Sequence, residues 1–478
     1  MGLRTAEEYK ESLRDGRRVY IRGEKVEDVT KHPILGITCD TVGASYELTA
    51  SDDKEIRDLF AAPHPETSEP INRLFITPRN SEDLRYRTKV IQRSMELTGG
   101  LPFGKDIGTD CLNAAFVVAG QMGNKQYQEN AMNFLEHLRK NDLHTCGAVT
   151  CVKGDRSKEP SKQKHPDYYL HVVDKNSEGI IVKGAKIHIT SAPVANEIIV
   201  VPTRQMRENE GDYALSFAIP ANTEGITFIC RAGRGAWSEH EFHGKQPVRE
   251  LTEAMIVFDN VFVPWDRVFM CGEWQYSMLL AYTFATFHRF TAISYKVPSV
   301  EIMAGCAVAM AKYNGLEKVG HIRDKLADVA AYVETLKALT NAAAQDPVMY
   351  GDIAVPNPLI ANMAKLHFAS KYHGFIELIQ DIAGGILATT PDQKDWENPD
   401  IHDYLEHYLG GSGEYSTLDR LKMVHETMRH VCSHDSAFHE VTTVHAEGSM
   451  AAQKMMILVE SPLKRYEERA KKAAGIID

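Results

Sequence analysis

The sequence predicts an α+β protein with a helical N-terminal domain, a middle antiparallel β domain and a C-terminal helical bundle. Apolar residues recur at helical spacing near the start and again after residue 276, whereas short β-branched runs separated by turn residues fill the middle. At 478 residues the chain is also long for a single core. We therefore expect domains at residues 1–141, 142–275 and 276–478.

Each domain is predicted from its own segments. The N-terminal domain contains YQENAMNFLEHLRK, in which Met132, Leu135 and Leu138 share one helical face. The middle domain contains GIIVKGAKIHIT, NEIIVVP and AMIVFDNVFVP, which are bounded by Gly, Pro, Asn and Asp. The C-terminal domain contains the long amphipathic segments IRDKLADVAAYVETLKALTNAAAQ and FIELIQDIAGGI, which indicate a bundle.

Composition excludes two classes of partner. The net charge is -11, from 54 Lys+Arg and 65 Asp+Glu, and no basic run forms a nucleic-acid footprint. No apolar stretch is long enough to span a membrane, and the N-terminus lacks an apolar secretory segment, so we expect a cytoplasmic protein.

The eight cysteines include no CxxC pair, which favours reduced thiols. A metal role for Cys146 and Cys151 is a weaker alternative, because further ligands at zinc spacing are missing.

The stretch TFATFHRFTAISYK, residues 283–296, is rich in aromatic residues. In a helix, Phe284, His288, Thr291 and Tyr295 share one stripe at i, i+4, i+7 and i+11 spacing. Pro298 is expected to kink or end this helix. The pattern alone favours a core helix with a hydrogen-bonded histidine over the wall of a pocket.

Three long segments carry a family resemblance. NDLHTCGAVTCVKGDRSKEPSKQKHPDYYLHVV, IIVKGAKIHITSAPVANEIIVVP and MIVFDNVFVPWDRVFMCGEW resemble the family of 4-hydroxybutyryl-CoA dehydratase and 4-hydroxyphenylacetate 3-hydroxylase, in the same order. The resemblance runs nearly end to end. It implies an acyl-CoA dehydrogenase-like fold, FAD at the junction of the β domain and the bundle, a CoA thioester substrate, and a homotetramer built as a dimer of dimers, or a homodimer.

In the dehydratase branch the resemblance implies an iron-sulfur cluster held by three cysteines and one histidine. Here Pro102 and Asp106 occupy the positions of a Cys-x3-Cys pair, and Tyr295 takes the place of the third cysteine, whereas His288 is retained. Such clusters need their thiolates. We therefore expect no iron-sulfur cluster and no other metal.

The hydroxylase branch is also matched incompletely. Its phenol-handling arginine and tyrosine align near Ile107 and Cys111, and its catalytic histidine aligns near Gly147. Since none of these side chains is retained, a hydroxylase that uses reduced flavin and oxygen is an alternative rather than the favoured interpretation.

The resemblance also implies cofactor contacts in three segments. VKGDRS matches an FAD-binding turn, although a solvated turn is the alternative, and KIHITS matches a strand whose threonine approaches the flavin. IQDIAGG resembles the segment that meets the partner subunit's cofactor. The cofactor-binding residues predicted in this way are Lys153, Asp155, Arg156, Thr190, Gln380, Gly384 and Gly385.

Candidate acid and base residues come from two further segments. VHAEGSMAAQKMM is similar to the acyl-CoA dehydrogenase motif in which a Glu before Gly removes the α-proton, which maps that base onto Glu447. A Glu that caps a helix is the alternative. Lys296 matches a family lysine beside the substrate, whereas its alternative is a surface position at a helix end. The predicted catalytic residues are His288, Glu447 and Lys296.

The replaced ligands suggest a different leaving group. A γ-hydroxyl leaves poorly without a Lewis acid, but a cationic amine does not need that help, and aromatic faces with an anion bind quaternary ammonium groups. The predicted substrate-binding residues are Tyr295, Asp106, Phe284, Phe287 and Thr291, with Phe290 and Trp237 near them.

The favoured hypothesis is therefore a redox-neutral, FAD-dependent elimination of a γ-substituent from an acyl-CoA. For γ-trimethylammoniobutyryl-CoA the products are trimethylamine and crotonyl-CoA. A cluster-free 4-hydroxybutyryl-CoA dehydratase or vinylacetyl-CoA isomerase is the alternative on the same scaffold, and aromatic hydroxylation is the alternative in another class. A non-catalytic flavoprotein fits the candidate acid and base residues poorly.

Overall fold

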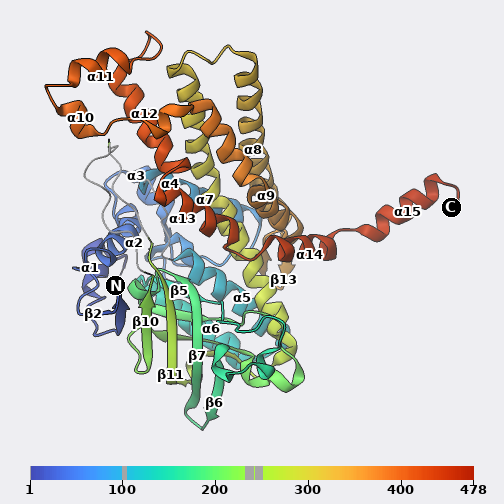
Figure 1. Cartoon of the computed structure of the whole chain (residues 1–478). Helices are drawn as coiled ribbons and strands as arrows, with labels where there is room; N and C mark the ends of the chain where they lie inside the picture. Colours follow the sequence, from blue (N-terminus) through green and yellow to red (C-terminus); the bar gives the residue numbers. More distant parts are fainter. Residues whose placement is uncertain (1, 99–104, 232–241, 243–250, 478) are drawn as a thin grey trace. The chain divides into compact units, whose positions relative to one another are not determined.

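The computed structural model describes residues 2–98, 105–231, 242 and 251–477. Contacts between residues divide the chain into two compact units. The first comprises Met1–Ser238, Gln246–Thr291 and Met349–Ala354, and the second comprises Glu239–Lys245, Ala292–Val348 and Val355–Asp478. The expected order of helical, β and helical segments is confirmed (Figure 1). The boundaries of the three expected domains stay a prediction.

The described N-terminal part of the first unit contains six helices, and capping side chains mark the start of several of them. Thr5 forms a capping box with Glu8 at the start of α1, and the side chain of Asn124 accepts from the backbone N–H of Tyr127 at the start of α6. Asp142 ends α6 in the left-handed conformation. These helices are α1 (Ala6–Glu11), α2 (Leu35–Thr49), α3 (Lys54–Phe60), α4 (Ser81–Thr98), α5 (Asp106–Met122) and α6 (Lys125–Asn141).

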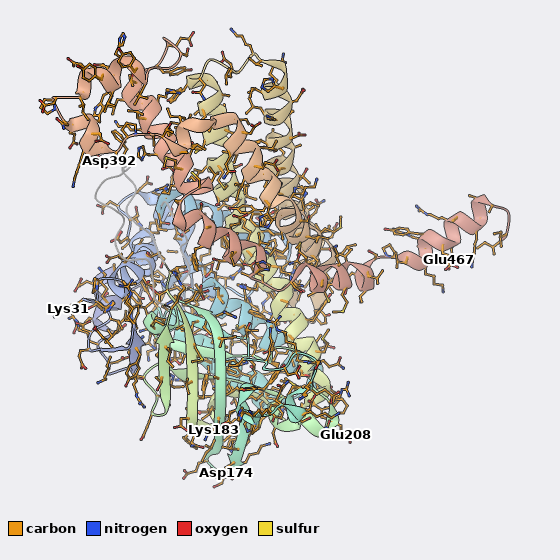
Figure 2. The ribbon with its side chains drawn as sticks, in the orientation of Figure 1. Lys31, Asp174, Lys183, Glu208, Asp392 and Glu467 are labelled. Atoms are coloured by element: carbon orange, nitrogen blue, oxygen red, sulfur yellow. The ribbon has the colours of Figure 1, made fainter. Side chains whose placement is uncertain are left out.

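Two main sheets follow in the first unit. The six-stranded sheet has the order β2-β1-β10-β11-β7-β6, and the four-stranded sheet has the order β12-β9-β8-β5. Their strands are β1 (Val19–Ile21), β2 (Glu24–Val26), β5 (Thr145–Ala148), β6 (His171–Lys175), β7 (Gly179–Thr190), β8 (Glu197–Val200), β9 (Leu215–Pro220), β10 (Ile226–Cys230), β11 (Glu253–Pro264) and β12 (Val268–Cys271). Asp174 of the edge strand β6 and Lys183 of the neighbouring β7 lie toward the same end of the larger sheet (Figure 2).

The β region differs from the sequence prediction in two ways. It is not wholly antiparallel, because β1 pairs with β10 and β5 pairs with β8 in parallel. It also recruits β1 and β2 from the N-terminal segment, where only helices were expected. Three-residue strands carry too few residues for their period to be recognised in a sequence. Two short pairs lie outside these sheets, β3 (Ala61–Pro63) with β4 (Pro70–Asn72) and β13 (Val348–Tyr350) with β14 (Ile353–Val355).

The helix α5 lies directly on the four-stranded sheet. A Cβ atom at Gly108 would lie 1.6 Å from Oγ1 of Thr145 in β5, so only glycine permits this approach. Around the contact, Leu112 of α5, Leu138 of α6 and Ile199 of β8 share one hydrophobic core. This packing fixes the helix that carries Asp106 and Asp110.

The second unit is helical. Its helices α13 and α14 both pack on α9, which also packs on α8. The bounds are α8 (Gly320–Gln345), α9 (Pro358–Ala383), α10 (Gln393–Glu397), α11 (His402–Tyr408), α12 (Thr417–Val431), α13 (His434–His445), α14 (Met450–Glu460) and α15 (Leu463–Ala473). No helix in the described ranges combines the length and the apolar character that a bilayer span needs.

The helix α7 (Ser277–Tyr313) contributes residues to both units. It continues through Pro298, so the expectation that it ends there is wrong. The neighbouring Val297 and Val300 are buried, and their packing outweighs the missing backbone hydrogen bond.

Candidate active site

In the first unit, α4, α5 and α7 bring together a buried polar network around Asp110. Oδ1 of Asp110 accepts from Nη2 of Arg87 at 2.8 Å and from Oγ1 of Thr291 at 3.0 Å. The same Arg87 nitrogen also donates to the Asp106 carbonyl and to Thr109 Oγ1. Both members of the Arg87–Asp110 ion pair are buried, so the hydrogen bonds must compensate for their desolvation.

The imidazole of His288 lies beside this network. Its ring stacks on Phe284 with centroids 5.1 Å apart and planes 20° apart. Its Nδ1 lies 3.5 Å from Oδ2 of Asp110. Within the described residues neither of these two buried atoms has a hydrogen-bond partner. The side chain of His288 is 16% exposed, so the ring is not sealed in the core.

Two further predicted substrate-binding residues lie in this unit. Phe287 is fully buried. Asp106 is buried at the start of α5, where its carboxylate accepts from the backbone N–H of Ile107. Burial, together with the nearby carboxylate of Asp110, raises the pKa of Asp106 to about 6. Asp106 lines a small cavity whose other described lining residues come from α2 to α4 and the segments beside them, not from α7.

In the second unit, one carboxylate is held by three donors. Nζ of Lys296 lies 3.0 Å from Oε1 and 3.1 Å from Oε2 of Glu447. Nζ of Lys365 lies 3.0 Å from Oε2, and the hydroxyl of Tyr295 donates to Oε1 at 2.6 Å. The side chains of both lysines and of Glu447 are at most 2% exposed. Two buried ammonium groups therefore neutralise and orient one buried carboxylate.

The backbone presents Glu447 from a tight turn. Glu447 lies between α13 and α14 with φ of 58°, followed by Gly448 with φ of 92°. A left-handed glutamate is uncommon and is strained unless its surroundings hold it. Ser449 caps α14 by accepting from the N–H of Ala452. The capping interpretation of Glu447 is therefore not needed, because Ser449 has that role.

Burial makes the ammonium group of Lys296 easier to deprotonate. Burial lowers the pKa of Lys296 to about 7, against the opposing effect of the Glu447 carboxylate. Its ammonium nitrogen lies 3.0 Å from the Tyr295 hydroxyl and 4.4 Å from the centre of that ring. Lys296 is 1% exposed and is not the surface lysine that its alternative required.

The FAD-binding turn predicted from VKGDRS carries unbalanced positive charge. Lys153 and Gly154 are consecutive left-handed residues with φ of 71° and 53°. Burial and the neighbouring Arg156 lower the pKa of Lys153, and burial with Lys153 and Arg156 lowers that of His188. Such a cationic turn suits a phosphate group. Asp155 instead accepts from the backbone and hydroxyl of Ser157, which shapes the turn itself.

Two of the remaining predicted cofactor residues, Thr190 and Gln380, already form hydrogen bonds with other protein groups. Oγ1 of Thr190 donates to Glu253 at 2.8 Å, and Nε2 of Gln380 donates to the carbonyl of Val431 at 2.6 Å. Gly384 ends α9 with φ of 78°, and neither it nor Gly385 has an atom within 4 Å of an added Cβ. The two glycines leave open space at the end of α9.

Six residues of these clusters were not predicted: Arg87, Thr109, Asp110, His188, Glu253 and Lys365. Burial raises the pKa of Glu253 to about 7 despite the Thr190 hydrogen bond. Lys365 had one signal in the sequence, since it lies on the apolar stripe of α9 with Ala361 and Phe368.

Pro102 and Trp237 lie outside the described residues. In the described ranges no group of three or more His, Cys, Asp or Glu could hold a metal ion.

Comparison with known proteins matches almost the whole chain. Residues 5–270 match the model of the 4-hydroxyphenylacetate 3-hydroxylase N-terminal region, and residues 278–475 match that of its C-terminal region. The chain is 32% identical over 500 residues to the 4-hydroxybutyryl-CoA dehydratase/vinylacetyl-CoA-Δ-isomerase of Clostridium aminobutyricum, covering 99% of this chain and 100% of that protein. This chain belongs to the family of 4-hydroxybutyryl-CoA dehydratase and 4-hydroxyphenylacetate 3-hydroxylase.

Solved structures from both branches of the family share the fold. An oxygen-tolerant archaeal 4-hydroxybutyryl-CoA dehydratase from N. maritimus has a TM-score of 0.88 at 28% identity, covering 100% of this chain and 96% of that one. The oxygenase component of 4-hydroxyphenylacetate 3-monooxygenase complexed with FAD has a TM-score of 0.88 at 26% identity, covering 99% and 100%. The predicted family and fold class are confirmed, and the relatives in both branches are enzymes.

Proposed function

We propose that the protein is a flavin-dependent lyase that eliminates a γ-substituent from an acyl-CoA, with γ-trimethylammoniobutyryl-CoA as the favoured substrate. The observation that carries this proposal is the replacement of thiolate positions by Asp106 and Tyr295, while His288 is retained. A carboxylate and a phenol cannot hold an iron-sulfur cluster, but an anion and an aromatic ring are suited to a quaternary ammonium group.

FAD is the cofactor of the proposed reaction. The left-handed turn at Lys153 and Gly154, with Arg156 beside it, has the positive charge that a pyrophosphate needs. Open space at Gly384 and Gly385 is compatible with a planar ligand. When bound, FAD would supply reversible two-electron exchange with the acyl chain.

The proposed proton steps belong to the titratable side chains of the two clusters. The thioester carbonyl acidifies the α-carbon, and Nε2 of His288 or the carboxylate of Glu447 accepts its proton. Glu447 accepts hydrogen bonds from Lys296 and Tyr295 and forms an ion pair with Lys365, so both of its carboxylate oxygens already have partners. The buried Nδ1 of His288 has no hydrogen-bond partner among the described residues, which supports His288 as the base and Glu447 with its lysines as the group that returns a proton.

The leaving group accounts for the electron balance. The bond from the γ-carbon to nitrogen breaks, its electron pair leaves with trimethylamine, and the chain retains one double bond as crotonyl-CoA. One proton is released for each substrate, and no external electron acceptor is consumed. Phe284, stacked on His288, offers an aromatic face for the quaternary ammonium group of the bound substrate.

Anaerobic turnover tests the proposal. The purified holoenzyme is incubated separately with γ-trimethylammoniobutyryl-CoA and with 4-hydroxybutyryl-CoA, and mass spectrometry follows the thioesters and free amine. Release of trimethylamine with crotonyl-CoA from the first substrate alone supports C–N cleavage. Turnover of the hydroxy substrate alone would favour the cluster-free dehydratase suggested by the 32% identical relative. Activity that requires oxygen and externally reduced flavin would instead favour the hydroxylase.

A further inference from the structure

Two buried polar atoms face each other without a hydrogen bond to any described residue. They are Oδ2 of Asp110 and Nδ1 of His288, which lie 3.5 Å apart. That separation is long for a hydrogen bond but short enough for a small side-chain rotation to close it. Buried carboxylate and imidazole atoms are rarely left without partners, so each is the natural partner of the other.

The Asp110 carboxylate is oriented by its other oxygen. Oδ1 is fixed by Arg87 from α4 and by Thr291 from α7. Arg87 is itself held by the Asp106 carbonyl and by Thr109, so the guanidinium is anchored independently of Asp110. With Oδ1 bound on two sides, the free oxygen is directed at the imidazole.

His288 is constrained from a second direction. Its ring stacks on Phe284, one turn earlier in α7, at an interplanar angle of 20°. Stacking limits rotation of the ring, and Asp110 lies on its Nδ1 side. The other nitrogen, Nε2, is on the opposite side of the imidazole, and the side chain is partly exposed.

We infer that Asp110 is a positioning residue that orients His288, keeps a proton on Nδ1 and thereby presents Nε2 as the base of the elimination. This inference rests on the proposed function for the identity of the proton donor, the α-carbon of an acyl-CoA. When Nε2 accepts that proton, the carboxylate stabilises the imidazolium that forms, as carboxylates do in other oriented imidazole bases. The proton balance is complete, because Nδ1 keeps its proton throughout.

A purely structural ion pair between Arg87 and Asp110 is the competing explanation. That explanation accounts for the hydrogen bonds that Oδ1 accepts, but it leaves Oδ2 buried and without a partner among the described residues. It also gives no reason for a histidine, rather than an apolar residue, beside that oxygen on α7. The two explanations differ in one measurable property, the proton affinity of His288.

Chemical modification of His288 measures that property without any substrate. Diethyl pyrocarbonate reacts with neutral imidazole, so peptide mass spectrometry of the holoenzyme across pH gives a midpoint for His288. Charged groups near the ring are Asp110 and Asp106 from α5, and Arg87 from α4 pairs with Oδ1 of Asp110. Because an adjacent anion favours the imidazolium, Asp110→Asn should lower the midpoint by about 1 unit or more. An unchanged midpoint would overturn the inference.

Matched variants separate charge from packing. Thr291→Val removes a hydrogen bond to the same carboxylate but keeps its charge, so its midpoint should shift less than that of Asp110→Asn. If Asp110→Asn does not fold because Arg87 is left uncompensated, the double variant Arg87→Leu with Asp110→Asn removes the ion pair as a unit. The double variant must show the same lowered midpoint.

A second assay separates this inference from the proposed reaction. Butyryl-CoA has no leaving group, so deuterium incorporation at its α-carbon in D2O reports only the base. Asp110→Asn should slow this exchange about 10-fold or more, and Asp110→Glu should recover part of the rate. If Asp110→Asn shows slow exchange and a lowered midpoint but the wild-type enzyme releases no amine, the proposed γ-elimination is refuted and the positioning role of Asp110 is retained. If the wild-type enzyme releases amine but Asp110→Asn keeps the wild-type midpoint and exchange rate, the γ-elimination is retained and the positioning role is refuted.

Discussion

The ammonium group of Lys365 lies 3.0 Å from Oε2 of Glu447, and both side chains are almost completely buried. Lys365 also donates to the carbonyls of Thr443 and Val444 near the end of α13. One lysine of α9 thus holds both the turn before Glu447 and the carboxylate itself. This explains how a glutamate with positive φ is kept in place.

Replacing Lys365 should destabilise the protein. Lys365→Met removes an ammonium group that is paired with the buried carboxylate, and breaking a buried ion pair typically lowers the free energy of unfolding by about 3 to 5 kcal/mol. Urea unfolding of the holoenzyme measures the change. Lys371→Met, at an exposed lysine of the same helix, is the matched control and should change it by less than about 0.5 kcal/mol. Equal effects of the two substitutions would contradict the anchoring role.

Lys296 should make stability depend on pH in a defined direction. The pKa of Lys296 is about 7 in the folded protein, below its ordinary value of 10.5. Between these values the unfolded chain binds the additional proton, so raising the pH favours the folded state. Wild type should therefore gain stability from pH 7 to pH 10 relative to Lys296→Met, as measured by urea unfolding of both proteins. Parallel stability curves for the two proteins would show that Lys296 does not titrate there.

The sequence predicted more of the fold than of the contacts. The helical and β segments follow from periodicity, and Glu447 and Lys296 follow from family motifs, yet nothing in one sequence places Lys365 beside them. Lys365 and Glu447 are separated by 82 positions, and their contact depends on how α13 and α9 pack. Asp110 was missed for a similar reason, because its partners Arg87 and Thr291 come from two other helices. Three-residue strands such as β1 carry no readable period, and the end of α7 was mispredicted because packing overrode Pro298.

Glu253 should make the stability of the protein depend on pH in the direction opposite to that of Lys296. Burial raises the pKa of Glu253 to about 7 from 4.5, so between these values the folded protein binds the additional proton. Stability should fall as the pH rises from about 4.5 to 7, by about 3 kcal/mol at most for this group. Glu253→Gln keeps an acceptor for Thr190 without the charge and should remove this loss. Thermal unfolding at pH 5 and pH 7 measures the difference, and an equal fall in both proteins would refute the assignment.

Tyr295 allows its ring and its hydroxyl to be tested separately. Tyr295→Leu should weaken binding of the trimethylammonium substrate by about 1 to 2 kcal/mol more than binding of a neutral analogue, because the aromatic face is lost. Tyr295→Phe keeps the ring but removes the hydrogen bond to Glu447, so it should impair turnover more than discrimination. Equilibrium binding of both thioesters to each variant checks this. Equal losses for charged and neutral ligands in Tyr295→Leu would exclude a cation site at this ring.

The helix α14 should contribute to assembly of the expected homotetramer or homodimer. Met455, Leu458 and Val459 lie on one face of α14 and are 53%, 61% and 69% exposed. A contiguous apolar face of this kind is normally covered by another chain. Leu458→Glu with Val459→Glu should therefore reduce the assembled mass in light scattering coupled to size-exclusion chromatography. Lys454→Glu, which adds negative charge at an exposed position of the same helix, should leave the mass unchanged, whereas equal masses for all three proteins would exclude α14 from the interface.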